Sequence, residues 1–252
     1  MKPATLRIAT YNLQKCVGLD LRRRPDRSLE VIEALGAQIV VLQEADKRLP
    51  PRPAALPAFM VEDAGWRVVP VGGPGGSLGW HGNAMLLRPG IGVEATDGIE
   101  LPGFEPRGAI RADLDTPLGP LRVIGLHLGL RRRDRLRQIA AIERALHHLP
   151  PRPTVLAGDF NAWGRAAALD ATAHSVRFIP GPASYPAPRP VAALDRFALS
   201  PQLHATRVGS TRAQPARVAS DHLPVWADLE LSSQGAEPEW QPSDTNCRNV
   251  EA

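Results

Sequence analysis

Residues 154–161 read TVLAGDFN, an apolar run that ends in an acid and an amide two residues apart. The apolar part is typical of a strand buried in a sheet, where charge is costly and Asn is a poor strand former. Asp159 and Asn161 therefore either form a turn beyond the strand or bind something there. Taken alone, the pair is more typical of an Asx turn.

Other apolar runs also end in polar side chains. Asn12 ends RIATYN, Glu44 ends IVVLQE, His127 ends RVIGLH, Asp195 lies in ALDRF, and SDHLP supplies Asp221 and His222. In a layered sheet such strand ends meet at one edge, which is how α/β proteins build sites. Carboxylate and amide oxygens without cysteine suit Mg²⁺ or Mn²⁺ ahead of zinc, and histidines at this edge could bind phosphate or carry protons.

The pattern of apolar runs predicts an α/β layered domain. Strands are expected over 6–14, 37–45, 66–71, 83–88, 108–116, 121–129, 153–161, 193–200 and 225–232. A helix is expected over 27–35, with Asp26 as its N-cap and Gly36 at its C-terminal end, and a second amphipathic helix over 133–149. A Pro-rich surface turn is expected over 50–60. Because several strands are wholly apolar, we expect packed sheets with helices outside.

Composition fits an ordinary globular protein. The chain has 252 residues, 43% of them hydrophobic and 22% charged, with a net charge of +4. Arg carries the positive excess, because the only lysines are Lys2, Lys15 and Lys47. Two distant cysteines, with no signal peptide and no apolar run long enough to span a membrane, predict a cytoplasmic protein.

Two Arg clusters, in 21–27 and 129–137, are either solvated faces or a binding rim, and the solvated face is slightly favoured. Trp80 and Trp163 could flank a cleft between them. No exposed apolar helix suggests lipid docking. Residues 232–252 lack periodicity and predict a disordered tail after one domain over 1–231.

The motifs YNLQ, LQE, GNAML, HLG, GDFN, LDR and SDHLP occur in the order and chemistry of the endonuclease/exonuclease/phosphatase superfamily. The YNLQK start resembles its small bacterial branch, which also carries a lysine at Lys15. The resemblance covers about 6–231. It implies a four-layer α/β sandwich, in which two packed mixed β-sheets are flanked by helices and a metal site lies at one edge.

The resemblance also implies roles for individual residues. Glu44 resembles the main metal-binding carboxylate, with Asn12 beside it and Asp221 near the metal, which is expected to be Mg²⁺ or Mn²⁺. Asp159 resembles the residue that orients or deprotonates the attacking water. Asn161 resembles the residue that holds the phosphoryl oxygens, and Asn83 matches a position near the substrate phosphate. His222 resembles the essential histidine, oriented by an acid that matches Asp195. His127 resembles a second histidine of the family.

These expectations define a Mg²⁺-dependent hydrolase of phosphodiester bonds, with DNA as the first substrate class and the Arg clusters as a possible DNA rim. The alternative is a phosphodiesterase or phosphatase that acts on phospholipid head groups or small phosphoesters. A binding module without activity is least favoured, because both GDFN and SDH are present. A monomer is expected.

Overall fold

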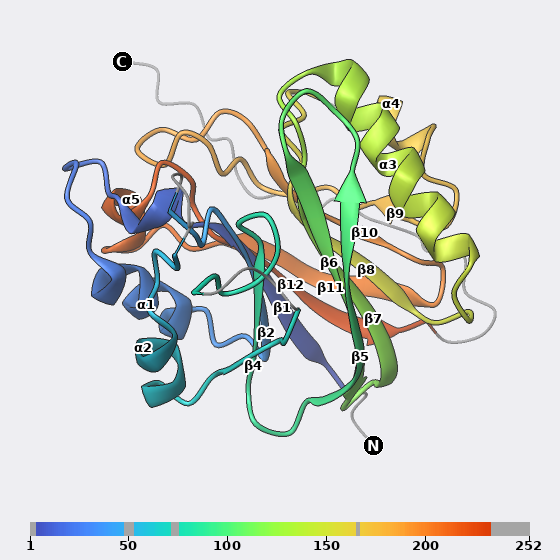
Figure 1. The fold of residues 1–252 in the computed structure, drawn as a ribbon, viewed down its shortest axis with the longest axis horizontal. Helices are drawn as coiled ribbons and strands as arrows, with labels where there is room; N and C mark the ends of the chain where they lie inside the picture. Colours follow the sequence, from blue (N-terminus) through green and yellow to red (C-terminus); the bar gives the residue numbers. More distant parts are fainter. Residues whose placement is uncertain (1–3, 48–52, 72–75, 165–166, 233–252) are drawn as a thin grey trace, which may run out of the picture.

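The computed structural model describes residues 4–47, 53–71, 76–164 and 167–232. Two six-stranded sheets pack face to face, and helices cover their outer faces (Figure 1). Each sheet is mixed, with one parallel pair of strands among antiparallel ones. The predicted four-layer sandwich is thereby confirmed. The predicted tail, apart from Ser232, lies outside the described residues.

The first sheet has the strand order β11-β12-β1-β2-β4-β3, and β1 and β2 form its parallel pair. Its strands are β1 (Leu6–Asn12), β2 (Ile39–Gln43), β3 (Arg67–Val68), β4 (Ala84–Leu87), β11 (Leu203–Ser210) and β12 (Val225–Leu231).

The second sheet has the order β5-β6-β7-β8-β10-β9, and β7 and β8 form its parallel pair. Its strands are β5 (Gly92–Leu101), β6 (Arg107–Thr116), β7 (Gly119–His127), β8 (Thr154–Asp159), β9 (Arg177–Phe178) and β10 (Asp195–Leu199).

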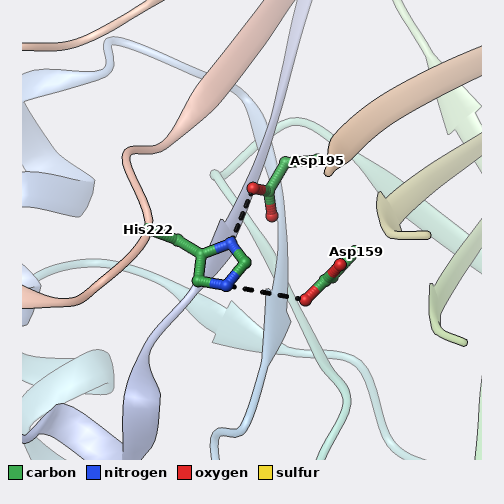
Figure 2. Close-up of side chains that lie close together, drawn as sticks. All are labelled: Asp159, Asp195 and His222. Atoms are coloured by element: carbon green, nitrogen blue, oxygen red, sulfur yellow. Dashed lines mark hydrogen bonds and ion pairs between the residues drawn. The ribbon is translucent and has the colours of Figure 1, made fainter. Parts of the chain in front are cut away.

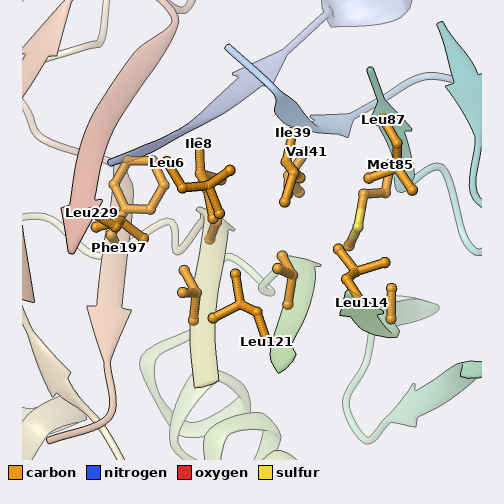
Figure 3. Close-up of a cluster of buried hydrophobic side chains, with 14 of the residues drawn as sticks. Leu6, Ile8, Ile39, Val41, Met85, Leu87, Leu114, Leu121, Phe197 and Leu229 are labelled. Carbon is orange, nitrogen blue, oxygen red and sulfur yellow. The ribbon is translucent and has the colours of Figure 1, made fainter. Parts of the chain in front are cut away.

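Alternate side chains of the central strands enter different cores, which is why these strands are apolar throughout. Ile8 and Val155 lie in the core between the two sheets, where Figure 3 shows side chains of both sheets facing one another. Their neighbours Ala9 and Leu156 face outward, each into a core shared with helices. The apolar run of TVLAGDFN is therefore buried on both faces of its sheet.

The helices cover the outer faces. α1 (Pro25–Ala34) and α2 (Ala58–Asp63) pack on the first sheet, and α3 (Arg132–His147) packs on the second. The short elements are η1 (Gln14–Cys16), α4 (Ala167–Asp170) and α5 (Ala216–Ala219). None of the helices in the described ranges is long and apolar enough to cross a membrane.

Some local predictions from the sequence were wrong. Asp26 is not the N-cap of α1: Pro25 occupies the first helical position, Arg24 is the cap, and the Asp26 carboxylate binds the Arg24 side chain. The helix α2 begins within the segment 50–60 predicted as a turn, of which residues 50–52 lie outside the described ones. The strand predicted over 66–71 is only Arg67–Val68. Strands β5 and β11 were not predicted, because they are edge strands with exposed polar side chains and lack an apolar run.

The polar side chains that the sequence places at the ends of apolar runs lie at one edge of the sandwich, here called the polar edge. It is where β1, β2, β5, β7, β8 and β11 end and where β4, β6, β10 and β12 begin. The pairing Asp195↔Asp159 shows why an acid at the start of β10 joins an acid at the end of β8. The other end of the strands is called the opposite edge.

Candidate active site

Three polar side chains lie in one row across the second sheet at the polar edge. His127, Asp159 and Asp195 are paired residues of the neighbouring strands β7, β8 and β10. Asn12, at the end of β1 in the first sheet, donates from Nδ2 to Asp159 Oδ2 over 3.1 Å. Asp159 therefore takes part in a hydrogen bond that joins the two sheets.

His222 completes this group from the loop between α5 and β12. Its Nδ1 lies 2.8 Å from Asp195 Oδ2, and its Nε2 lies 3.8 Å from Asp159 Oδ2 (Figure 2). All three side chains are buried. Because the Asp195 carboxylate can only accept, the short contact fixes Nδ1 as a donor and directs Nε2 toward Asp159.

Two buried serines hold this arrangement. Ser184 Oγ donates to Asp195 Oδ2 over 2.6 Å and lies 3.3 Å from the Asp195 backbone N–H. Ser220 Oγ donates to the Asn12 carbonyl over 2.7 Å, and the His222 backbone N–H donates to Ser220 Oγ. The loop that carries His222 is thus anchored to the end of β1.

Electrostatics give the two main groups unequal proton affinities. Burial lowers the pKa of His222, but the charge and hydrogen bond of Asp195 outweigh it and raise this pKa to about 9. Burial and the charge of Asp195 raise the pKa of Asp159 to about 6. A protonated imidazole therefore faces a carboxylate that binds a proton more readily than an ordinary aspartate.

His127 is held as the neutral imidazole. Burial and the charge of Arg107 lower the pKa of His127 well below its ordinary value. Arg107 Nη1 lies 2.9 Å from His127 Nδ1. Because a guanidinium can only donate, Nδ1 accepts and the proton is on Nε2, which lies 3.4 Å from Asp159 Oδ2.

Asn161 turns back toward the strand end. It has φ +49°, its backbone N–H donates to Asp159 Oδ1 over 2.9 Å, and its Nδ2 donates to the Leu128 carbonyl over 2.8 Å. GDFN therefore does form an Asx turn, and this turn fixes the Asp159 carboxylate. Gly158 is required beside it, since a Cβ would lie 1.9 Å from the Leu126 carbonyl oxygen.

The residues expected to bind a metal lie on adjoining segments of the same edge. The Glu44 carboxylate binds the Lys15 ammonium, and the Lys15 N–H donates to the Glu44 carbonyl. Gln14 connects the other two, because its N–H donates to Asn12 Oδ1 and its Oε1 accepts from the Asp221 N–H.

A second set of possible ligands comes from the buried group itself. Ligand atoms of Asp159, Asp195 and His222 lie within 4.8 Å of one another, so this group could hold a metal ion. Asp195 Oδ1 is buried and has no hydrogen-bond partner among the described residues, so one oxygen ligand is unused. Carboxylates, an amide and imidazole without thiolate fit a hard divalent cation.

Asn83 lies apart from this network. It is buried, and its Nδ2 donates to the Gly108 carbonyl over 2.9 Å and to the Trp80 carbonyl over 3.2 Å. These contacts tie the loop before β4 to the start of β6 at the polar edge. Its Oδ1 is buried without a partner in the described part of the chain.

Sequence reasoning missed Arg107 and Ser184. Arg107 is the first residue of β6 and also binds Glu105, while Ser184 lies in a loop before β10. The position of Arg107 at the start of a strand could have indicated that it lies near the site. Its contact with His127 was not predictable, because the two residues are twenty positions apart in the sequence. Ser184 has no such signal, because its role depends on loop geometry.

Aromatic rings border the site. The Tyr185 ring lies 4.9 Å from the His222 ring, centroid to centroid, and the Trp163 ring lies 6.0 Å from that of Tyr185. The sequence had suggested that Trp163 could flank a cleft, and the structure places it beside the ring that covers His222.

This fold and this group of residues define a family. A model of the endonuclease/exonuclease/phosphatase family matches residues 9–222, from the middle of β1 to His222. The chain therefore belongs to the endonuclease/exonuclease/phosphatase family, as the motifs had indicated.

Individual relatives are more distant. The Escherichia coli (strain K12) uncharacterized protein YbhP is 29% identical over 164 residues, which are 61% of this chain and 64% of YbhP. The D. rerio TDP2 structure with a single-strand DNA product has a TM-score of 0.69 at 16% identity, covering 90% of this chain and 99% of the other. The Bacteroides thetaiotaomicron mannosyl-6-phosphatase Bt3783 has a TM-score of 0.69 at 18% identity, covering 89% and 99%. The two structures share the fold.

Proposed function

We propose that this protein is a metal-dependent hydrolase of phosphodiester bonds. The observation that carries the proposal is the buried Asp195–His222 hydrogen bond directed at Asp159, whose carboxylate also contacts Asn12 of the other sheet. Burying two carboxylates and an imidazole in one place is costly for stability, and such groups are concentrated at catalytic sites.

In the proposed chemistry the nucleophile is a water molecule bound beside Asp159. Asp159 orients the attacking water and accepts its proton, since its pKa is raised toward neutrality. Protonated His222 donates from Nε2 to a phosphoryl oxygen on which charge develops. Asp195 keeps the His222 ring oriented and protonated.

Three further residues complete the proposed substrate site. His127 presents Nε2–H at the same carboxylate, and Arg107 prevents its tautomer from changing. Asn161 and Asn83 are proposed phosphate-binding residues. Each donates from Nδ2 to a main-chain carbonyl, which holds it at the polar edge.

For the metal we propose Mg²⁺, with Mn²⁺ as a possible substitute, held by Glu44 with Asn12 and Asp221. When bound there, such an ion would neutralise charge on the phosphoryl or leaving oxygen. The Glu44–Lys15 ion pair supports this assignment, because the half-buried carboxylate already binds a cation in the structure.

DNA is the substrate class that the sequence ranks first. The Arg clusters lie at the polar edge, one in the loop before α1 and the first turn of that helix, the other in the loop after β7 and the first turns of α3. A phosphate backbone would bind there, and D. rerio TDP2 is similar in fold. Phospholipid head groups form the second class, favoured by exposed apolar side chains at the same edge. A monomer in the cytoplasm remains the prediction from sequence.

The test compares two substrates with one catalytic control. Supercoiled plasmid and a soluble aryl phosphodiester are incubated with the protein and Mg²⁺, with EDTA, and with the His222→Ala variant. We expect metal-dependent hydrolysis of the aryl diester that EDTA and the substitution both abolish. Nicking of plasmid under the same conditions would establish a nuclease. A folded protein that hydrolyses neither substrate with Mg²⁺ or Mn²⁺ would refute the proposal.

A further inference from the structure

The polar edge carries most of the large apolar side chains that are exposed among the described residues. Eight large hydrophobic residues are exposed in the described part of the chain. Six of them lie in loops at the polar edge: Leu19, Leu21, Phe104, Leu130, Trp163 and Val191. The other two are Phe59, on the outer helix α2, and Leu231, at the end of β12 on the opposite edge.

These six side chains come from five separate loops around one site. The loop after β1 presents Leu19 and Leu21, and the β5–β6 loop presents Phe104. The loops after β7 and β8 and before β10 present Leu130, Trp163 and Val191 respectively. Loops so far apart in the sequence converge only because the strands bring them to the same edge.

The most exposed of them are at loop tips. Leu21 is 87% exposed, Phe104 77%, Val191 69% and Leu130 65%. Leu21 also has φ +59°, a conformation that an aliphatic residue adopts at a cost. Isolated exposed leucines are common on protein surfaces, but a set gathered around one site marks an interaction surface.

Unpaired positive charge lies between the apolar tips. Arg22 and Arg23 follow Leu21, and Arg132 and Arg133 follow Leu130. All four are exposed, and none forms an ion pair with a described residue. Arg131 lies over the Phe104 ring at 4.4 Å and so keeps its charge beside the apolar tip. By contrast, Arg88 and Arg152 toward the opposite edge are each paired with a glutamate.

We propose that the polar edge is a membrane-docking surface, on which Leu21, Phe104 and Leu130 enter the interface of an anionic phospholipid bilayer while the neighbouring arginines bind lipid phosphates. The alternation of apolar tips with unpaired arginines is the pattern by which proteins lie on anionic membranes. Docking in this way would face the buried Asp159–His222 group toward the head groups. That part of the inference rests on the proposed function and makes a phospholipid phosphoester the substrate class.

Nucleic acid fits the same surface less well. Arginines and exposed aromatic rings serve both partners, since bases stack on aromatic side chains. Exposed aliphatic tips such as Leu21, Leu130 and Val191 give no stacking surface and no hydrogen bond to a phosphate backbone. Inside a bilayer interface each of them gains by leaving water. The aliphatic side chains therefore favour a bilayer over nucleic acid as the partner of this surface.

The experiment measures sedimentation of the full chain with vesicles. Vesicles of phosphatidylcholine alone are compared with vesicles of phosphatidylglycerol and phosphatidylcholine, at low and high salt. We expect binding to the anionic vesicles only, weakened by salt. Changing Phe104→Ser with Leu130→Ser, or Arg132→Gln with Arg133→Gln, should weaken binding by about tenfold or more. Phe59→Ser, at the other exposed phenylalanine of the described residues, on α2, is the matched control and should bind like the wild type.

Two results would overturn the proposal. The first is a wild-type protein that stays in the supernatant with anionic vesicles, including one that instead binds single-stranded or plasmid DNA through the same arginines. The second is a loss of vesicle binding in Phe59→Ser as large as in the loop variants, which would indicate non-specific adsorption. All these side chains are exposed, and melting curves of each variant check that folding is unchanged.

Activity separates this proposal from the proposed function. On the soluble aryl phosphodiester the Phe104→Ser with Leu130→Ser variant should retain the wild-type rate, since neither side chain contacts the buried group. His222→Ala should lose that rate and still bind vesicles. If the wild type binds vesicles but has no hydrolase activity, the docking surface stands and the proposed function fails. If the wild type hydrolyses the soluble diester but does not bind vesicles, the proposed function stands and the docking surface fails.

Discussion

The two edges of the sandwich fill similar turn positions with different residues. Seven non-glycine residues have positive φ in the described part of the chain, and all lie in the loops or the short helix η1 of the polar edge: Gln14, Lys15, Cys16, Leu21, Glu44, His81 and Asn161. At the opposite edge, the turns that need positive φ carry glycine, at Gly36, Gly65, Gly90 and Gly119. The opposite edge avoids the steric cost that the polar edge accepts.

The difference indicates what each edge is built for. A left-handed conformation costs a non-glycine residue on the order of 1 kcal/mol or more, and it persists where a side chain at that position is needed. Glu44 and Asn161 are two such side chains, one binding Lys15 and the other fixing the turn around Asp159. Glycine would relieve the backbone at either position but supply no carboxylate or amide.

The largest effect should come from removing the carboxylate at the centre of the polar edge. Asp159→Asn keeps the shape of the side chain but cannot accept a proton from water, so hydrolysis of the aryl phosphodiester should fall by about a thousandfold. Because burial and the Asp195 charge already disfavour the ionised form of Asp159, we expect no fall in the melting temperature.

The matched control for this substitution is Asp115→Asn, an exposed aspartate at the end of β6 on the opposite edge. It should change neither the rate nor the melting temperature. A rate for Asp159→Asn within a few-fold of the wild type would show that the proton acceptor is elsewhere.

A smaller effect is expected at Arg107, which contacts the site only through His127. Arg107→Gln removes the donor that fixes the neutral tautomer of His127, so the rate should fall by about tenfold. The pH profile of the rate should also change, since the positive charge that lowers the pKa of His127 is gone. Arg152→Gln, which breaks only an exposed pair with Glu94 near the opposite edge, should alter neither. An unchanged pH profile in Arg107→Gln would contradict this role.

The sequence predicts the polar edge better than it predicts the rest of the surface. Buried central strands are apolar throughout, and a polar residue at the end of such a run stands out, as Asn12, His127 and Asp159 do. Parallel pairing then brings these ends together, so the resemblance and the strand pattern lead to the same residues. The edge strands β5 and β11 could not be found in this way, because one of their faces meets water.

Residues that act through loop geometry were also beyond sequence reasoning. Ser184 reaches Asp195 across a loop, and no pattern marks it. The apolar tips were missed for a related reason: one leucine in a polar loop is unremarkable, and only the fold gathers Leu21, Phe104 and Leu130 at one edge. The sequence offers no exposed apolar helix for lipid docking, whereas these tips are on loops.

The difference in positive-φ residues between the two edges can be tested by replacing a glycine of the opposite edge with alanine. Gly119, in the β6–β7 turn, has φ +85°, and a Cβ there would meet nothing within 4 Å. Gly119→Ala should therefore cost only backbone strain, about 1 kcal/mol of unfolding free energy, measured by urea denaturation. The hydrolysis rate should not change. A loss of several kcal/mol would mean that packing, and not conformation, selects glycine at this edge.

The smallest effect is the converse change at the polar edge. Leu21→Gly relieves a left-handed leucine that is 87% exposed, and the strain removed slightly exceeds the extra chain entropy of glycine, so the free energy of unfolding should rise by about 0.5 kcal/mol. Urea denaturation beside Gly119→Ala measures both signs in one series. The soluble diester should be hydrolysed at the wild-type rate, while vesicle binding should weaken. If the variant is more stable and still binds vesicles fully, the strained backbone at Leu21 does not serve membrane binding. If the variant gains stability and loses vesicle binding, the strained conformation at the polar edge is retained because the Leu21 side chain is needed for contact with the membrane.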